Sequence, residues 1–219
     1  LFKLNKSSDG FIKVEFAFDR KVKGSIVAKI PSNYERLIVC NPADLHRWTF
    51  TEKMYAIPVE QANVTFDNVE IVTDKDKPLL SSDWSAGFYK KHTTWLWWAG
   101  QGYSDKHIVG FNFATFINDS LYPERALWID NKKHEIPMVK FDIDFEDPHR
   151  KMHIYSDDDV VNLTFSIGDV RKDVANRFNL IKTNFRQFVG CYNGYFKIKD
   201  KKYEIKNLNG LFELHASIW

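Results

Sequence analysis

Cysteines are scarce in this sequence, and long apolar segments are missing. Its 219 residues include two cysteines, Cys40 and Cys191, which excludes a disulfide framework and favours two buried, reduced thiols over a single bridge. No apolar run approaches the roughly 18 residues that a membrane-spanning helix needs, and no signal peptide is recognisable. We therefore predict a cytoplasmic protein without a membrane span. Because the chain opens on Leu1 and not on methionine, we also expect that an N-terminal part is missing or has been processed.

An excess of charge of one sign is also missing. The chain has 31 lysines and arginines against 29 aspartates and glutamates, a formal net charge of +2, whereas a nucleic-acid-binding domain carries a concentrated basic face. No phosphate-binding loop or nucleophile elbow occurs. His149 and His153 would have metal-ligand spacing on a helix, but Pro148 and the alternating residues around them argue against a helix. We predict no nucleic-acid partner, no metal and no cofactor, and we leave the oligomeric state open.

Aromatic residues are abundant, and apolar residues alternate with polar ones. Aromatics make up 16% of the chain, and residues 11–18 and 139–145 show the period of two that is typical of half-buried strands. About fifteen such segments predict an all-β fold of antiparallel sheets, either a sandwich or two packed calycin-like (lipocalin-like) barrels. Residues 173–181 are an exception, where we expect a short helix or an irregular crossing. The predicted units are a single all-β domain, 1–219, or two barrel-like halves, 1–116 and 117–219.

Four of the seven tryptophans gather near the middle of the chain. Segments 93–99 and 108–116 there predict a β-hairpin. Successive side chains on a strand point to opposite faces, so Trp95 and Trp97 share one face and Trp98 lies on the other. Both faces are bulky, and we expect the strand to be covered on both sides. One face then lines a cavity while the other packs the core; the alternative is that both faces only pack the core.

Two acidic residues are candidates for catalysis. Asp83 follows a polar segment and precedes Trp84. Burial in apolar surroundings favours the protonated form of a carboxyl group, which makes Asp83 a candidate general acid. Its alternative role is to cap a turn through backbone amides. Glu124 is a candidate assisting carboxylate, or else a structural ion-pair partner beside Arg125.

Further residues are candidates for contact with a ligand. Indole rings suit either a flat isoprenoid or a sugar ring, whereas Lys53 is equally compatible with an ordinary strand lysine. Asn112 must be hydrogen-bonded if it points inward, because an unsatisfied buried amide costs about 1–3 kcal/mol. Glu213 alternates with Leu214, and we expect it at a rim or in solvent. The predicted ligand-contact residues are Lys53, Trp84, His92, Trp95, Trp97, Trp98 and Asn112.

An ordered series of short segments resembles the domain-of-unknown-function (DUF) 2804 family, from about residue 25 to the C-terminus. The segments are TFTEK (49–53), SSDWSAG (81–87), TTWLWWAGQG (93–102), VGFNF (109–113), PERALWIDNK (123–132), FVGCYNG (188–194) and LNGLFELHASIW (208–219). A Glu-Asn pair usual in the family is here Glu124-Arg125. The family's activity is not established, so the resemblance implies no catalytic residues.

A second resemblance, at the level of the fold, is to calycin-like double barrels such as AttH-like proteins, carotenoid hydratases and tocopherol cyclases. These proteins bind isoprenoid substrates inside barrels, and some protonate an alkene with a buried acid. The resemblance implies a ligand cavity, but fold alone does not assign a function.

Three functions are compatible with these features. The first is binding of an apolar or amphipathic small molecule in an aromatic-lined β-barrel cavity. The second is an acid-catalysed hydratase, cyclase or isomerase acting on an isoprenoid-like substrate, with Asp83 as general acid and Glu124 assisting. The third is carbohydrate binding by the tryptophans. Catalysis requires two convergent carboxyl groups in one pocket, a lipid binder requires a dry apolar cavity, and a sugar binder requires an exposed aromatic platform. Whether the protein is an enzyme stays open at this point.

Overall fold

The protein is built from antiparallel strands. The computed structural model describes residues 1–219 except 20, 72–76, 116–122, 144–150, 178–180 and 219. Every regular element in this described part is a β-strand, and all strand pairs are antiparallel. The predicted all-β class of antiparallel sheets is therefore confirmed. The division of the chain into one unit or two halves stays a prediction, and the pairing of strand 92–104 with strand 201–218 links parts of both halves.

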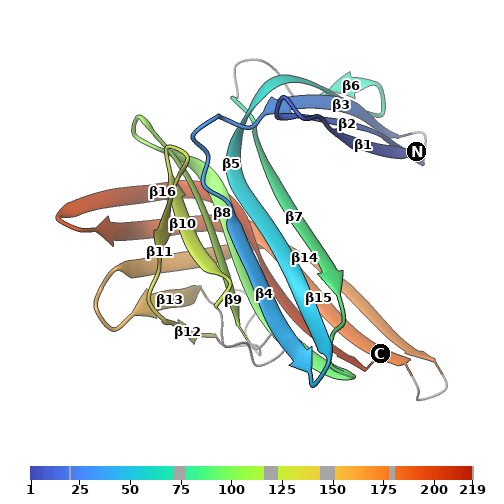
Figure 1. Cartoon of the computed structure of the whole chain (residues 1–219). Coiled ribbons are helices and arrows are strands. Elements are labelled where there is room, and N and C mark those ends of the chain that lie inside the picture. Colours follow the sequence, from blue (N-terminus) through green and yellow to red (C-terminus); the bar gives the residue numbers. More distant parts are fainter. Residues whose placement is uncertain (20, 72–76, 116–122, 144–150, 178–180, 219) are drawn as a thin grey trace.

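The first sheet contains seven strands and is organised by one long strand. Its elements are β1 (Phe2–Lys6), β2 (Phe11–Phe18), β3 (Val22–Lys29), β4 (Leu37–Asp44), β5 (Arg47–Phe66), β6 (Val69–Glu70) and β7 (Leu79–Gly87). The first half of β5 pairs with β4 and β7, and its second half pairs with β3 and β6. Between the halves, Ala56 has a φ of 60° and the register with β7 shifts, which is a bulge that bends the strand. The bend is visible in Figure 1, where β5 rises beside β7 and then turns over toward β1–β3.

The second sheet contains nine strands and curls into a half-barrel (Figure 1). Its elements are β8 (His92–Ser104), β9 (His107–Thr115), β10 (Arg125–Ile129), β11 (Lys132–Glu135), β12 (Val139–Asp142), β13 (Met152–Ser156), β14 (Val161–Arg177), β15 (Ile181–Ile198) and β16 (Lys201–Ile218). The order is β11-β10-β9-β8-β16-β15-β14-β13-β12. The predicted hairpin is confirmed as β8–β9, with Ser104 opposite His107.

The core fills the inside of the curled sheet with aromatic rings. Trp98 is completely buried there, and its ring lies 3.6 Å from the ring of Phe141 and 4.7 Å from that of Phe212, centroid to centroid. The opposite face of β8 is turned toward the first sheet, where Trp97 packs against the cluster formed by Leu37, Val39, Tyr55, Ala99, Ala126 and Trp128. The strand is thus covered on both sides, as its two bulky faces predict.

Two expectations about local structure are wrong. Residues 173–181 hold no helix in their described part, because β14 continues to Arg177 and β15 begins at Ile181. Cross-strand pairing, such as Asp173 with Phe185, overrides the weak local preference of this polar segment. Asp83 does not lie in a turn either, since Ser81–Gly87 belong to β7 and pair with β5.

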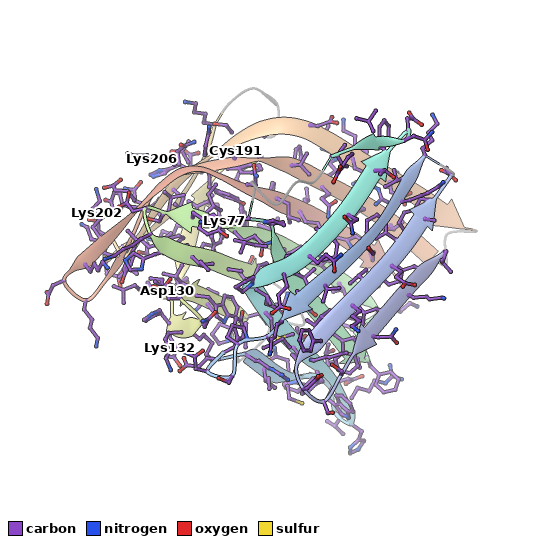
Figure 2. All side chains as sticks on the ribbon, turned by 90° about the horizontal axis from the view of Figure 1, so that it is seen from above. Lys77, Asp130, Lys132, Cys191, Lys202 and Lys206 are labelled. Atoms are coloured by element: carbon purple, nitrogen blue, oxygen red, sulfur yellow. The ribbon has the colours of Figure 1, made fainter. Side chains whose placement is uncertain are left out.

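The two cysteines lie in different sheets as free thiols, as predicted, but the expectation that both are buried is wrong. Cys40 is exposed on β4, and Cys191 is partly buried on β15. Figure 2 shows Cys191, Lys202 and Lys206 on the side of the molecule away from β1–β3. The described residues include no helix long and apolar enough to cross a membrane.

Candidate functional site

A small pocket lies where the two sheets meet. Its volume is about 130 Å³, which is well below the ~300–1,000 Å³ of sites for drug-sized ligands. Strands β5 and β7 form one wall, and strands β8 and β16 form the other. The lining residues are Thr51, Lys53, Asp83, Ser85, Tyr89, Trp95, Trp97, Glu124 and Glu213. Charged groups and aromatic rings therefore share a space that is large enough for a small molecule or for one end of a larger one.

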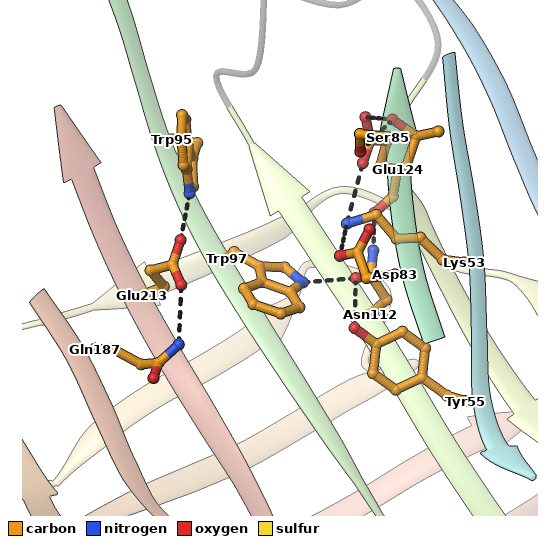
Figure 3. Close-up of polar contacts among 11 residues, drawn as sticks. Lys53, Tyr55, Asp83, Ser85, Trp95, Trp97, Asn112, Glu124, Gln187 and Glu213 are labelled. Carbon is orange, nitrogen blue, oxygen red and sulfur yellow. Dashed lines mark hydrogen bonds and ion pairs between the residues drawn. The ribbon is translucent and has the colours of Figure 1, made fainter. Parts of the chain in front are cut away.

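An ammonium group between two carboxyl groups forms the first wall (Figure 3). The Nζ atom of Lys53 lies 2.8 Å from Oδ2 of Asp83 and 3.2 Å from Oε2 of Glu124. Asp83 stands directly opposite Lys53 in the β5–β7 ladder, and Glu124 immediately precedes β10. The side chains of Lys53 and Glu124 are 5% and 4% exposed, whereas that of Asp83 is 32% exposed. Asp83 is thus the member of this cluster that solvent reaches.

The Lys53 ammonium keeps its charge despite its burial. Burial lowers the pKa of Lys53, but attraction by Glu124 and Asp83 outweighs it and raises the pKa above the ordinary value. Each carboxylate accepts a hydrogen bond from the ammonium. The Oγ1 atom of Thr51 donates to Oε1 of Glu124 at 3.4 Å and lies 3.3 Å from Oγ of Ser85. Hydroxyl groups therefore extend the ion-paired cluster along this wall.

Asn112 fixes the tryptophan that separates the two walls. Its Oδ1 atom accepts hydrogen bonds from Nε1 of Trp97 at 2.6 Å and from the hydroxyl of Tyr55 at 3.3 Å. Its Nδ2 atom donates to the carbonyl oxygen of Glu124 at 2.6 Å. Burial, and next the charge of Asp83, raise the pKa of Tyr55, so its hydroxyl remains a donor. The fully buried amide is thereby satisfied, as we expected for an inward Asn112.

Glu213 forms the second wall. It lies opposite Trp97 in the β16–β8 ladder and is 6% exposed. Its carboxyl group accepts hydrogen bonds from Nε1 of Trp95 at 2.7 Å and from Nε2 of Gln187, on β15, at 3.1 Å. Burial raises the pKa of Glu213 above the ordinary value, against the opposing effect of these hydrogen bonds. The expectation of a rim or solvent position is wrong, because the faces of β8 and β16 are covered by the first sheet.

The structure brings together six of the predicted site residues. Lys53, Asp83, Glu124, Trp95 and Trp97 line the pocket, and Asn112 lies behind Trp97. The three others lie elsewhere.

Trp84 follows Asp83 on β7, so its side chain points to the opposite face, where it is 55% exposed. His92 is exposed at the start of β8, and Trp98 is in the core of the curled sheet. The alternative of a turn-capping Asp83 is wrong, because its carboxyl group binds Lys53 from within a strand.

Several residues of the site were not found from the sequence. These are Thr51, Tyr55, Ser85, Tyr89, Gln187 and Glu213. Their polar side chains come from five separate segments, and only the pairing of distant strands joins them. Of these residues, only Glu213 could have been indicated by the sequence, because it is a single acid within the largely apolar segment LFELHASIW.

The pocket does not have the arrangement of a metal centre. Within the described ranges, no three His, Cys, Asp or Glu side chains are placed to hold one ion. The Lys53 ammonium lies between Asp83 and Glu124, where it takes the position that a cation would need.

The fold belongs to a known class of β-proteins. The crystal structure of kievitone hydratase from Nectria haematococca has the same fold, with a TM-score of 0.56 and 10% sequence identity, over 100% of this chain and 68% of that one. This agrees with the fold-level resemblance to AttH-like proteins. The chain itself belongs to the family described as "Domain of unknown function (DUF2804)", which matches residues 2–219. No curated protein matches the chain.

Proposed function

We propose that the pocket binds a small amphipathic molecule and transfers a proton to it, with Glu213 as the donor, in a hydratase or isomerase reaction. The arrangement that supports this is a buried carboxyl group on one wall facing an ion-paired cluster on the other. Burial favours the protonated form of Glu213, which a general acid requires. Asp83 and Glu124 are instead ion-paired with the Lys53 ammonium, which favours their ionised forms. We therefore assign the role of proton donor to Glu213 in place of Asp83.

The first wall supplies the complementary base. In an addition of water to a carbon–carbon double bond, the Glu213 proton forms a new C–H bond and the π electrons leave a cation on the adjacent carbon. A water molecule then attacks that carbon and loses a proton to the carboxylate of Asp83, which is more exposed than that of Glu124. In an isomerisation, Asp83 removes a proton from a neighbouring carbon instead. Exchange with solvent restores both carboxyl groups.

The lining favours an amphipathic ligand over a wholly apolar one. Tyr89, Trp95 and Trp97 provide aromatic surface, while the other six lining residues carry hydroxyl, ammonium or carboxyl groups. A dry lipid cavity is lined mostly by apolar side chains. The shared fold of a hydratase supports addition of water among the proton-transfer reactions. We also propose the cytoplasm as compartment, because both cysteines are free thiols.

Isotope labelling tests this function. The protein is incubated in D₂O or in H₂¹⁸O with a panel of small isoprenoid alkenes and alkenols, and the products are analysed by mass spectrometry. Isomerisation incorporates deuterium at carbon, and hydration also incorporates ¹⁸O. We expect Glu213→Gln to slow labelling by about 10²–10⁴-fold, the contribution typical of a general acid.

Glu204→Gln is the matched control, since Glu204 lies on the same strand with its side chain 48% exposed. Equal labelling by wild type and Glu213→Gln, or no labelling of any panel member by wild type, would contradict the proposed proton transfer.

A second candidate is a binding protein without catalysis. The observation in its favour is the network in which Asn112 holds Trp97 and Tyr55, because a rigid wall suits binding without requiring chemistry. Co-purification of a small molecule, detected by native mass spectrometry, together with no isotope labelling would favour this candidate. Carbohydrate binding has less support, since Trp95 and Trp97 are half-buried and form no open platform.

A further inference from the structure

The balance of charge in the pocket is negative. Three carboxyl groups, from Asp83, Glu124 and Glu213, face one ammonium group, from Lys53, among the lining residues that the structure describes. With Glu213 protonated, two carboxylates and one ammonium leave a formal charge of −1, and ionisation of Glu213 makes it −2. The Lys53 charge is engaged at 2.8 Å and 3.2 Å by Asp83 and Glu124. The space beside Glu213 therefore has a negative potential, which attracts a cation and repels an anion.

Aromatic rings border the same space. Tyr89 and Trp95 stack with their centroids 6.2 Å apart, and Trp97 already has the Lys53 Nζ atom 5.1 Å from its ring centroid. Contacts of this kind, within about 6 Å of an indole centroid, are cation–π interactions. The Trp95 N–H donates to Glu213, and a hydrogen bond to a carboxyl group polarises the ring toward a more negative face. Negative charge and aromatic surface, the two features that attract an organic cation, therefore border the same pocket.

We propose that this pocket selects for positive charge and binds a small organic cation, of the quaternary ammonium class, more tightly than a neutral molecule of the same shape. The volume fits such a group. About 130 Å³ corresponds to roughly four water molecules at ~30 Å³ each, and a trimethylammonium group has four heavy atoms. The rings of Trp95 and Tyr89 would contact its methyl groups, and Glu213 would become its counter-ion on losing its proton.

The proposed selectivity for cations extends the proposed function, and the part that it would play in catalysis rests on that function. When Glu213 gives its proton to an alkene carbon, the substrate gains a positive charge and Glu213 gains a negative one. The cation then lies beside indole rings and opposite the new carboxylate. Interactions that are stronger in the transition state than with the neutral substrate accelerate the reaction. A quaternary ammonium ion is a stable mimic of that cation and should compete with the alkene.

A pair of isosteric probes tests the proposal. Choline and 3,3-dimethyl-1-butanol differ in having N⁺ or carbon at the centre of the same branched group. Binding to the full chain is measured by titration calorimetry and by tryptophan fluorescence. We expect choline to bind at least ten-fold more tightly than the alcohol, with affinity that falls as salt is added. Equal affinities, or no detectable binding of choline, would overturn the proposal.

Variants locate the binding to this pocket. Trp95→Leu and Tyr89→Leu should each weaken choline binding by about five- to thirty-fold, the range for loss of one desolvated cation–π contact. Trp48→Leu is the matched control, since Trp48 is 49% exposed on β5 outside the pocket, and it should leave choline binding unchanged. Tyr89 lies in the segment between β7 and β8, so its variant remains informative if Trp95→Leu does not fold. Equal losses in Tyr89→Leu and Trp48→Leu would overturn the assignment.

The two proposals fail in distinguishable ways. Preference for choline with no isotope labelling of alkenes would sustain the cation site and reject the proton transfer. Labelling that depends on Glu213, without any preference for choline, would reject the cation site alone. If both hold, choline should inhibit labelling competitively, and the neutral alcohol should inhibit it at least ten-fold more weakly.

Discussion

The substitution Lys53→Met, which removes the ammonium, should lower the free energy of unfolding more than the loss of any exposed ion pair does. In Lys53→Met the aliphatic stem is retained, but Glu124 loses its charged partner at 3.2 Å. The Glu124 side chain is 4% exposed, so solvent screens the unpaired carboxylate only weakly. Loss of one partner of a buried pair costs about 3–5 kcal/mol. Asp83 is one-third exposed, and its own loss of the partner should add at most about 1 kcal/mol because solvent screens it.

A second substitution should recover much of this loss. In Lys53→Met/Glu124→Gln the uncompensated charge is gone, and a neutral amide retains the ability to accept from Thr51. Replacement of a whole buried pair by uncharged groups is often close to neutral. We therefore expect the double variant to be more stable than Lys53→Met by about 2–4 kcal/mol, a non-additivity that a double-mutant cycle measures directly.

Equilibrium unfolding in urea provides the measurement, with the unchanged slope m as the check that the folded and unfolded states are comparable. Lys3→Met is the control, because the Lys3–Glu15 pair is 4.0 Å apart with both side chains 60% exposed, and its loss should cost no more than about 0.5 kcal/mol. If Lys53→Met costs less than about 1 kcal/mol, or if the double variant is no more stable than the single one, the charge pairing of Glu124 is not what holds this wall.

Three further predictions concern Glu213, Asn112 and Trp98. The folded pKa of Glu213 is raised, so its contribution to stability is complete below pH 4.5 and is lost as the pH rises through the folded pKa; Glu213→Gln should therefore gain stability relative to wild type as unfolding is measured from pH 4.5 to 7.5. Asn112→Leu leaves Nε1 of Trp97 unpaired and should cost about 1–3 kcal/mol in unfolding free energy, with a change in the near-ultraviolet circular dichroism of the indole. Trp98→Ala removes a fully buried ring and should cost about 3–5 kcal/mol, which calorimetry detects as a lowered Tm.

The alternation of side chains along β8 could be predicted from the sequence, but the elements that pack on each face could not. Period two correctly separates Trp95 and Trp97 from Trp98. Which face meets a cavity depends on which sheet lies over it, and that is decided by contacts between residues far apart in the chain. Trp98 meets Phe212, whereas Trp97 meets Lys53. A local pattern contains no information about either partner.

The acidic side of the site was harder to predict because β7 has a poor strand composition. Aspartate and glycine are depleted in strands, and the local composition therefore did not predict a strand over Ser81–Gly87. Its strand conformation comes from pairing with the long strand β5, which places Asp83 opposite Lys53. Glu213 required two long-range registers, one with β8 and one with β15. In both cases the tertiary pairing outweighed the local preference.

The pocket is also where the chain departs from what stability alone favours. Along β5, the buried residues Thr49, Thr51 and Lys53 are polar or charged, while the next four residues, 54–57, are buried and belong to the hydrophobic core. Buried charges are weak contributors to stability, and well-packed apolar residues of similar volume would serve the fold as well or better. The opposite face of β8 shows that this chain can fill such a space with aromatic and aliphatic side chains. Charged groups at the junction of the sheets are therefore better explained by a role toward a ligand than by a role in folding, since departures from a consistent apolar core concentrate at functional sites.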